Sequence, residues 1–524
     1  MIPASTSVYD LAQRRSRLLA VSSTARFESV ETDAPVWSLA YDRVTDHRGG
    51  PSVPDIETDY LVVGAGASGM AFTDALIASS DAEVVMVDRR HRPGGHWNDD
   101  YPFVRLHQPS AFYGVASRAL GQDRIDESGI NAGFYERATA AEMCDYYSRV
   151  LDEHFLPSGQ VRFFGMHDHL GNDADGHLLR SRVTGQTTTV RVRRKLVDAT
   201  YIESSLPSTH TPAYTVDPAA VVVTPNGLLG LDEPASGFTV IGAGKTSMDT
   251  CCWLIEQGVD PDTIRWIRPR DAWTADRASI QPLRLVGAFV EWVAAQNEAS
   301  ARAESLDELF PALEDRRVFH RLDPGVEPVF NRGAILCEAE RVMLRDVGNV
   351  VRLGKVNHVG ADRIDLDEET IPNEAGHVVV DCTAAGLASP PDRRVYDPDR
   401  ITIQWIQAGI APFNAALIGF VEASREDDTD KNRLCTARGF SRRADVVNYA
   451  AGWLNTQRGF LLWLAEPDLA DWLSTCRLSP FGNAGPYLGD PATTEAFGRM
   501  VGAQGPAVEN LQRLLAEVDS FETA

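Results

Sequence analysis

Two glycine-rich loops constrain this chain more than any other feature of its sequence. The first lies in LVVGAGASGM, residues 61–70, and the second in TVIGAGKTSMD, residues 239–249. A hydrophobic run that leads into G-x-G-x-x-G is typical of a buried strand turning into a helix whose N-terminus faces a phosphate-bearing ligand. The chain has 524 residues, more than one ordinary core uses, so the two loops predict two dinucleotide-binding domains.

The first loop has every part of the dinucleotide fingerprint. A strand, the loop and a helix in DYLVVGAGASGMAFTDALIAS are followed by AEVVMVDRR, a second strand that ends at Asp88. Gly64 permits the tight turn, Gly66 lets a pyrophosphate approach the backbone, and Gly69 allows the helix to pack closely. Asp88 is placed to accept hydrogen bonds from ribose hydroxyls, whereas the alternative for the whole segment is an ordinary tight turn. The other cofactor-binding residues predicted here are Ala67, Ser68 and Arg89.

The second loop departs from the fingerprint at one position. Ser247 stands where the third glycine is expected, which is tolerable if the helix packs slightly farther from the strand. Gly242 and Gly244 keep the first two positions and are predicted to contact a cofactor. Lys245 and Thr246 either touch a phosphate in the same way or face water.

The strand that follows the second loop ends in Arg268-Pro-Arg270 instead of an acid. An arginine pair at this place binds a 2′-phosphate, which an acidic residue would repel. We therefore expect NADPH rather than NADH, with Arg268 and Arg270 as contacts. The alternative is that both arginines are solvated surface charges.

Net charge, hydrophobic runs and cysteine spacing indicate which kinds of partner the protein binds and in which compartment it works. The formal net charge of -24 at pH 7 comes without a visible basic stripe, which argues against nucleic acid. No apolar run approaches the roughly 20 residues of a membrane span, and RRSRLLAVSSTARF lacks a hydrophobic stretch of signal-peptide length. The 7 cysteines include no C-x-x-C pair, which suits a reducing compartment. We expect a cytoplasmic protein that acts on a small molecule, with no nucleic-acid and no membrane partner.

A resemblance to a known class follows from the residues after Asp88. Gly94-Gly95-His96-Trp97 is followed by Tyr101-Pro102, Arg105, Ser110 and Tyr113. This pattern is similar to the first half of flavin-containing and Baeyer-Villiger monooxygenases, and to the wider FAD-dependent pyridine nucleotide oxidoreductases, over residues 59 to about 420. The resemblance implies FAD at the first loop, NADPH at the second, and one cofactor supplying hydride to the other. It also implies contacts near the flavin from Gly95, His96, Trp97, Leu106 and His107.

The same resemblance implies an α/β fold with two Rossmann-like dinucleotide-binding domains, the NADPH domain inserted in the FAD domain. The expected segments are an N-terminal arm (1–58), the first part of the FAD-binding domain (59–206), the NADPH-binding domain (207–375), and the second part of the FAD-binding domain with a C-terminal helical region (376–524). Residues 350–372 alternate as a small strand ribbon would. Aromatic residues at helical spacing in 446–481 are expected in the core, with a substrate pocket or an interface between identical subunits as the alternatives.

Two departures from the class affect the catalytic prediction. The F-x-G-x-x-x-H motif that precedes the second loop in strict members is missing. His107 stands where Baeyer-Villiger enzymes carry an acid and many relatives an asparagine. A histidine there donates or accepts a hydrogen bond at a flavin edge when neutral and steadies an anion when charged, so His107 and Arg105 are the predicted catalytic residues. A structural or flavin-packing role is the alternative for His107.

The function that these residues imply is an NADPH-dependent flavoprotein monooxygenase that oxygenates a small organic molecule by N-, S- or Baeyer-Villiger oxidation through a peroxyflavin. The missing motif favours the alternative of a FAD-dependent NADPH oxidoreductase without oxygen transfer. A flavin-binding protein without enzymatic activity is a third hypothesis, against which the intact glycines of the second loop count. The sequence contains no motif for a serine nucleophile, a zinc site or a P-loop, and no metal is expected.

Overall fold

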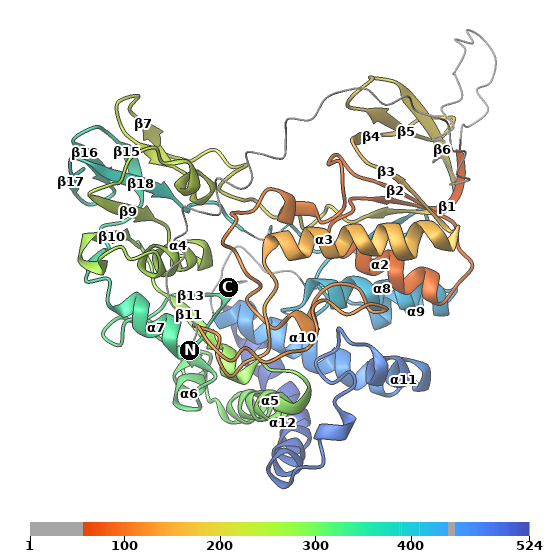
Figure 1. The fold of residues 1–524 in the computed structure, drawn as a ribbon. Coiled ribbons are helices and arrows are strands. Elements are labelled where there is room, and N and C mark those ends of the chain that lie inside the picture. Colours follow the sequence, from red (N-terminus) through yellow and green to blue (C-terminus); the bar gives the residue numbers. More distant parts are fainter. Residues whose placement is uncertain (1–55, 387, 389, 408, 439–445, 523–524) are drawn as a thin grey trace, which may run out of the picture. The chain divides into compact units, whose positions relative to one another are not determined.

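The computed structural model describes residues 56–522, apart from 387, 389, 408 and 439–445. The predicted N-terminal arm therefore lies outside the described residues except for its end. The described residues form two main β-sheets, one mixed but largely parallel and one entirely parallel, each with helices packed against it (Figure 1). The predicted α/β class with two Rossmann-like units is confirmed.

The first sheet combines parallel strands with an antiparallel extension. In spatial order its strands are β3 (Val161–Phe164), β2 (Val84–Val87), β1 (Ile56–Val63), β6 (Thr187–Asp198), β5 (His177–Ser181) and β4 (His167–Asn172), and β19 (Arg400–Thr402) also pairs with β6. Strands β3, β2, β1, β6 and β19 run parallel, whereas β5 is antiparallel to β6 and β4 is antiparallel to β5. Val63 pairs in register with Val87 and with Asp198, so the carboxyl ends of these strands meet at one edge.

Helix α2 (Ala67–Ala78) is buried on all sides because almost every residue in it is apolar or small. It packs against α8 (Ala411–Ser424), where a Cβ atom on Gly419 would lie 2.5 Å from the Phe72 carbonyl oxygen. Helix α3 (Ala140–Val150) covers the same unit and begins with a capping box between Thr139 and Glu142. These helices share one apolar core with the first sheet.

The second sheet is entirely parallel. In spatial order its strands are β14 (Asn349–Val351), β10 (Ile264–Ile267), β9 (Gly237–Ile241), β18 (His377–Asp381) and β8 (Val222–Val223). Helix α4 (Lys245–Glu256) follows β9 and contacts α7 (Glu338–Arg345). Every strand of this sheet lies between β6 and β19 in the sequence, so the second unit is inserted in the first.

The strand pairing places one domain boundary differently from the sequence prediction. The segment from residue 376 is predicted to return to the first domain, but β18 pairs in register with β9 and β8 of the second sheet. The first sheet resumes only at β19. The physical reason is that β18 is an apolar strand bounded by polar residues, and its sequence fits either sheet equally well.

A small ribbon stands beside the second sheet. It consists of β15 (Val356–Val359), β16 (Arg363–Leu366) and β17 (Thr370–Pro372), which are antiparallel, and β7 (Thr215–Val216), which runs parallel to β15. The strand ribbon predicted for residues 350–372 is therefore present.

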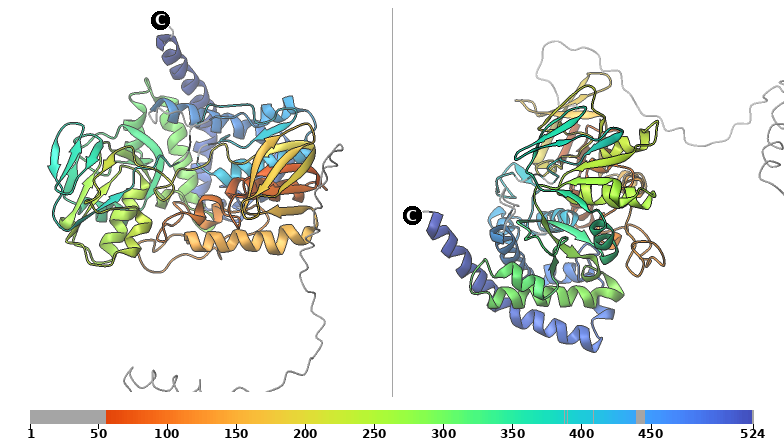
Figure 2. Two further views of the ribbon diagram at one scale, coloured as in Figure 1. Left: turned by 90° about the horizontal axis from the view of Figure 1, so that it is seen from above. Right: turned by 90° about the vertical axis from the view of Figure 1, so that its left-hand side faces the viewer.

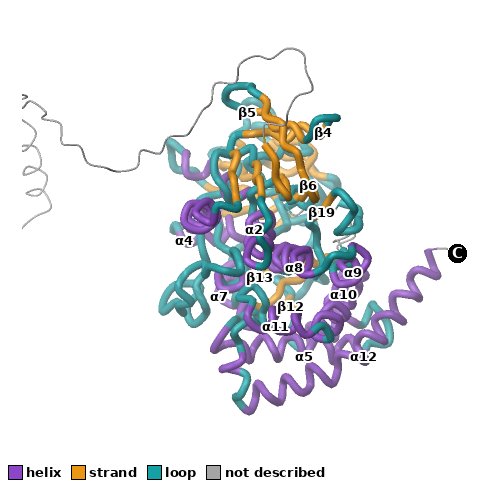
Figure 3. Tube along the Cα trace, turned by 90° about the vertical axis from the view of Figure 1, so that its right-hand side faces the viewer, coloured by secondary structure: helices purple, strands orange, loops and turns teal. Residues whose placement is uncertain are grey.

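A helical region joins the middle of the chain to its C-terminal part. Its elements are β11 (Ala272–Asp276), α5 (Val286–Arg302), α6 (Leu309–Asp315), β12 (Phe319–His320), β13 (Phe330–Leu336), α9 (Asp428–Leu434), α10 (Val446–Leu464), α11 (Pro467–Thr475) and α12 (Pro491–Glu522). Helices α5 and α12 lie side by side in both views of Figure 2, and Figure 3 shows α10 beside them. Trp273, Phe310, Trp453 and Leu511 belong to one buried cluster. Thus α5 and α6, although within the predicted NADPH-binding segment, pack with the C-terminal helices.

Among the described residues, none of the helices combines the length and the apolar character that crossing a membrane requires.

Candidate functional site

The first glycine loop makes a turn that excludes side chains at two of its positions. Gly64 has φ +101°, and a Cβ atom there would lie 2.9 Å from Thr200 Cγ2. A Cβ atom on Gly69 would lie 1.9 Å from the carbonyl oxygen of Gly64, so α2 starts directly against the loop. Gly66 precedes the helix and has no side chain to cap it. The first N–H groups of α2, at Ala67 and Ser68, therefore face outward from the helix as donors suited to an anion.

A second glycine turn contacts this loop. Gly94 and Gly95 have φ +115° and +57°, and the Gly94 N–H donates to the Ala65 carbonyl at 2.9 Å. A Cβ atom on Gly95 would lie 2.7 Å from Gly66 Cα. The two backbone segments therefore touch at Gly66 and Gly95, and neither glycine has a side chain to obstruct a ligand there.

Asp88 lies buried at the end of β2 and holds the first loop in place. Its Oδ2 accepts a hydrogen bond from the Ala65 N–H at 2.7 Å, and its Oδ1 accepts one from the Arg90 N–H at 2.8 Å. Each carboxylate oxygen keeps a further acceptor position. The predicted contact Arg89 is exposed and forms an ion pair with Glu203.

His96 and Trp97 both have partners within the protein. His96 Nδ1 lies 3.2 Å from Asp100 Oδ2. Trp97 is buried, and its Nε1 donates to the Tyr113 hydroxyl at 3.3 Å while the two rings meet edge to face. These contacts hold the Trp97 ring within the protein core.

The second glycine loop has the same design with one difference. Gly242 has φ +143°, and a Cβ atom there would lie 2.6 Å from the Cys382 carbonyl oxygen. Gly244 precedes α4 and is exposed, and a Cβ atom there would meet nothing within 4 Å. Ser247, in place of the third glycine, is buried, and its hydroxyl donates to the Gly244 carbonyl at 2.8 Å. The serine is accommodated because its polar atom has a partner.

Lys245 and Tyr101 meet at Asp249 on the first turn of α4. The Lys245 ammonium forms an ion pair with Asp249, and the Tyr101 hydroxyl donates to Asp249 Oδ2 at 2.8 Å. Thr246 is half-buried beside them, and its carbonyl accepts from the Thr250 hydroxyl. Tyr101 belongs to the segment after the Gly94-Gly95 turn, so this contact connects the first unit to the second glycine loop.

The arginines predicted to bind a 2′-phosphate lie in different environments. Arg268 is 3% exposed, stacks on Trp266 and pairs with Asp271 Oδ1 at 2.9 Å. Burial lowers its pKa. Arg270 is exposed and lies over the Phe330 ring. Of the two, only Arg270 presents its guanidinium to solvent.

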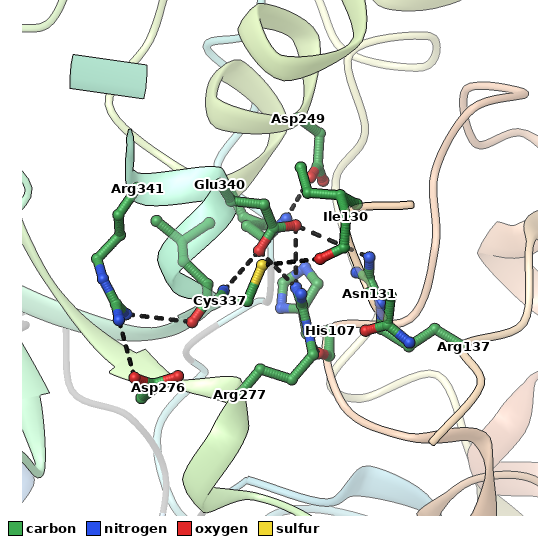
Figure 4. A network of polar contacts seen from close by, with 12 residues as sticks. His107, Ile130, Asn131, Arg137, Asp249, Asp276, Arg277, Cys337, Glu340 and Arg341 are labelled. Carbon is green, nitrogen blue, oxygen red and sulfur yellow. Dashed lines mark hydrogen bonds and ion pairs between the residues drawn. The ribbon is translucent and has the colours of Figure 1, made fainter. Parts of the chain in front are cut away.

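Two buried arginines hold the backbone of the His107 segment (Figure 4). The Arg277 Nε donates to the His107 carbonyl at 3.1 Å, and an Arg137 nitrogen donates to the Leu106 carbonyl at 3.2 Å. Arg105 is exposed, and its guanidinium donates to the Arg137 carbonyl at 3.2 Å. Of the two predicted catalytic residues, His107 alone lies within this network of buried charges.

Sequence reasoning did not identify Arg137, Arg277 or Glu340 as residues of the site. Glu340 binds Arg277 through both carboxylate oxygens, at 3.0 and 2.7 Å, and lies 3.8 Å from Arg137. None of these residues belongs to a recognisable motif. Ionisable side chains are rarely buried unless paired, and the pairing is made by the fold.

The surroundings of His107 keep its ring neutral. Burial, with added repulsion from Lys245, lowers the pKa of His107 to about 4. The unfolded chain takes up a proton near pH 6.5 and the folded chain only near pH 4, so stability falls as pH decreases through this window. Because asparagine does not titrate, we expect the free energy of unfolding of His107→Asn to fall less between pH 6.5 and pH 4, by up to about 3 kcal/mol. Urea unfolding at pH 7 and pH 4.5 measures the difference, and equal pH dependence in both proteins would contradict the shift.

The first glycine loop and its surroundings match a family model. The model of the NAD(P)-binding Rossmann-like domain matches residues 62–109, a range that includes Asp88, the Gly94-Gly95 turn and His107.

Solved structures with a similar chain path include monooxygenases. A polycyclic ketone monooxygenase from Thermothelomyces thermophila is 12% identical, with a TM-score of 0.48, over 88% of this chain and 92% of that one. A cyclohexanone monooxygenase from Rhodococcus sp. Phi1 is 11% identical, with a TM-score of 0.44, over 87% and 98% of the two chains. Likeness at this level assigns no activity to the chain.

A curated relative is much more similar in sequence. Uncharacterized protein Rv2000 of Mycobacterium tuberculosis is 43% identical over 438 residues, which span 83% of this chain and 79% of that protein. Uncharacterized protein Mb2023 of Mycobacterium bovis matches over the same share with the same identity. Identity of this extent across most of both chains shows common descent, and the protein belongs to the family of the mycobacterial protein Rv2000.

Proposed function

We propose that this protein is an NADPH-dependent flavoprotein monooxygenase that holds FAD at the first glycine loop and NADPH at the second. The observation that carries the proposal is that two glycine loops, each at the carboxyl edge of its own parallel sheet, are joined by one segment, residues 99–107. Ligands of open α/β sheets bind at such edges. A protein in which a hydrogen bond, from Tyr101 to Asp249, links the units of two such sites is suited to passing hydride between two nucleotides.

The residues at the first loop fit FAD. The contact between Gly66 and Gly95 leaves a backbone surface that any Cβ atom would obstruct, which is what the close approach of a pyrophosphate requires. Asp88 retains acceptor positions for ribose hydroxyls while its other lone pairs fix the loop. The N-terminus of α2 supplies the positive end of a helix dipole.

The residues at the second loop fit NADPH. Gly244 is exposed with open space where a Cβ atom would stand, directly before the first turn of α4. Lys245 brings a cation to the same turn. The exposed Arg270, shortly after β10, supports contact with a 2′-phosphate, whereas Arg268 is engaged with Asp271.

The chain's own part in the chemistry is to bind, orient and hold protons. FAD, when bound, would supply an acceptor for hydride from NADPH and a donor of electrons to dioxygen or to another acceptor. His107 is neutral at physiological pH, so its ring offers one N–H donor and one acceptor to the flavin or to the substrate. The substrate proposed is a small amine, sulfide or ketone, because these are the groups that N-, S- and Baeyer-Villiger oxidations modify.

Product analysis tests the proposal. The FAD-loaded protein is reduced anaerobically with NADPH and then exposed to ¹⁸O₂ in the presence of a panel of amines, sulfides and ketones. Transfer of labelled oxygen into one of these compounds, with NADPH consumed in equal amount, is the expected result. Flavin reduction with hydrogen peroxide as the only oxygen product for the whole panel would contradict oxygen transfer.

That contradicting result would favour a FAD-dependent NADPH oxidoreductase without oxygen transfer. A specific observation supports this second candidate. The segment before the second loop, which forms the strand β8 and the turns that follow it, lacks the F-x-G-x-x-x-H motif of strict monooxygenases. Rapid reduction of a quinone or a dye by the NADPH-reduced protein would distinguish it.

Arg270→Ala is expected to raise KM for NADPH by about tenfold and to change KM for NADH little, because a charge-assisted hydrogen bond to a phosphate contributes about 1.5–3 kcal/mol. Steady-state kinetics with both cofactors measures the effect. Arg268→Ala serves as the comparison, since its loss removes a buried ion pair with Asp271 and is expected to lower stability instead. An equal rise in KM for both cofactors in Arg270→Ala would exclude the 2′-phosphate contact.

A further inference from the structure

Two consecutive backbone carbonyls near the proposed flavin site are held by side chains from distant parts of the chain. Arg137 donates to the Leu106 carbonyl and Arg277 to the His107 carbonyl. Backbone carbonyls of a loop are more often bonded within the loop or to water. Here the position of both peptide groups is set by two guanidinium groups, of which Arg277 is fully buried.

One carboxylate holds both arginines. Glu340 grips Arg277 with both oxygens and faces Arg137 at 3.8 Å, and all three side chains are at most 6% exposed. Both bonds to Glu340 come from Arg277 Nη2, whereas Nε donates to the His107 carbonyl, so the guanidinium is held at two of its nitrogens. Burial by itself raises the pKa of Glu340, but the cations Lys245, Arg277 and Arg137 outweigh it and lower the pKa to about 2, so the carboxylate is charged at neutral pH.

The helix α7 fixes Glu340 in turn. Glu340 is the third residue of α7, and its Oε2 accepts a hydrogen bond from the Cys337 N–H at 2.7 Å in a capping box. The next residue, Arg341, donates to Asp276 Oδ2 at 2.8 Å. Two adjacent ion pairs result, Asp276 with Arg341 and Arg277 with Glu340, so acid and base alternate on each of the two segments (Figure 4). A shift of α7 along the end of β11 would bring like charges together, and the pairs therefore fix how the two segments lie against each other.

The same groups set the electrostatic environment of His107. The charged residues that face it are Lys245 and Asp249 from α4, Arg277 from the segment after β11, and Arg137 from the segment before α3. Glu340 compensates the two arginines, so the ring meets a small excess of positive charge rather than two bare guanidinium groups.

We propose that Glu340 is a positioning residue for His107: through Arg277 and Arg137 it fixes the two carbonyls that place the His107 side chain, and so orients this ring toward the bound flavin. The inference rests on the proposed function, because it takes His107 to face that cofactor. Glu340 holds the His107 segment through the hydrogen bonds and ion pairs of the two arginines, and its charge also interacts with Lys245 at the second glycine loop.

The test compares three variants of the full-length, FAD-loaded protein. Glu340→Gln removes the charge that joins the arginines. Arg277→Lys keeps the cation and loses the planar fork and the Nε donor. Glu338→Gln is the matched control, because it removes a carboxylate from the same helix whose side chain is 63% exposed. Thermal unfolding and flavin content are recorded for each variant.

Histidine ¹⁵N spectra and kinetics are the two readouts. The ring signal of His107, assigned by its absence in His107→Asn, is expected to move in Glu340→Gln and in Arg277→Lys and to stay in Glu338→Gln. Turnover at saturating NADPH is expected to fall about tenfold or more in the first two variants, while KM for NADPH stays within about twofold. The double variant is expected to cost no more than the worse single one, because the residues act as a unit.

The outcomes separate the two proposals. An unmoved His107 signal in a folded Arg277→Lys protein overturns the positioning role, and Arg277→Lys decides the matter even if Glu340→Gln fails to fold. A moved signal with unchanged turnover supports the positioning of the ring and overturns the part of the proposed function that assigns His107 to the reaction.

Discussion

Gly69→Ala is expected to purify without bound FAD. The added Cβ atom would lie 1.9 Å from the Gly64 carbonyl oxygen, so the loop and the start of α2 have to move apart. A displacement of about 1 Å at the backbone that faces a pyrophosphate is expected to weaken FAD binding about 100-fold or more. Visible absorbance of the purified protein and titration of the apoprotein with FAD measure the effect.

Gly244→Ala is the matched control for this experiment. Gly244 has φ -96°, which alanine adopts without strain, and its Cβ atom would meet no protein atom within 4 Å. We expect normal folding and normal FAD content in this variant, with weaker NADPH binding only because the methyl group occupies the cofactor's approach. Full FAD affinity in Gly69→Ala would contradict the placement of FAD at the first loop.

Glu340→Leu is expected to lower the free energy of unfolding by about 3–5 kcal/mol, because it leaves buried cations without their counter-charge. Arg277 has no exposed surface, and the Arg137 side chain is 5% exposed. Urea unfolding followed by circular dichroism measures the change, and a loss below about 1 kcal/mol would mean that water or a neighbour compensates the arginines.

The paired variant Arg277→Met with Glu340→Leu is expected to be more stable than Glu340→Leu alone, since it removes a cation together with the anion.

The contribution of Glu340 to the free energy of unfolding depends on pH because the folded protein lowers its pKa. Because its folded-state pKa of about 2 lies below the ordinary value of 4.5, its stabilisation is complete above about pH 4.5 and is lost as pH falls toward 2.

The local geometry of the two cofactor loops was predictable from the sequence. Gly64 is required by its positive φ and Gly69 by its contact with the Gly64 carbonyl, and Asp88 reaches the loop because both stand at the ends of neighbouring parallel strands. Such short-range requirements leave a readable pattern of residue types. Even the departure at Ser247 has a local explanation in its bond to Gly244.

Features that depend on distant packing were not predictable. The sequence shows Arg268 at a strand end but not that Asp271 and Trp266 occupy it. It shows α5 within the second unit but not that this helix packs along α12. Glu340 and Arg277 look like ordinary surface charges until the fold buries them together, because burial of an ion pair is set by tertiary contacts and leaves no periodic signal.

Asp249 gives the two cofactor sites a means of thermodynamic coupling. It holds the hydroxyl of Tyr101, in the segment that leads to His107, and the ammonium of Lys245, at the loop proposed for NADPH. A cofactor phosphate that binds Lys245 weakens the ion pair between Lys245 and Asp249, which changes the charge that the Tyr101 hydroxyl meets at Asp249. Binding at the second loop therefore changes the free energy of the segment that borders the first. By reciprocity, whatever factor NADPH then imposes on the affinity for FAD, FAD imposes on the affinity for NADPH.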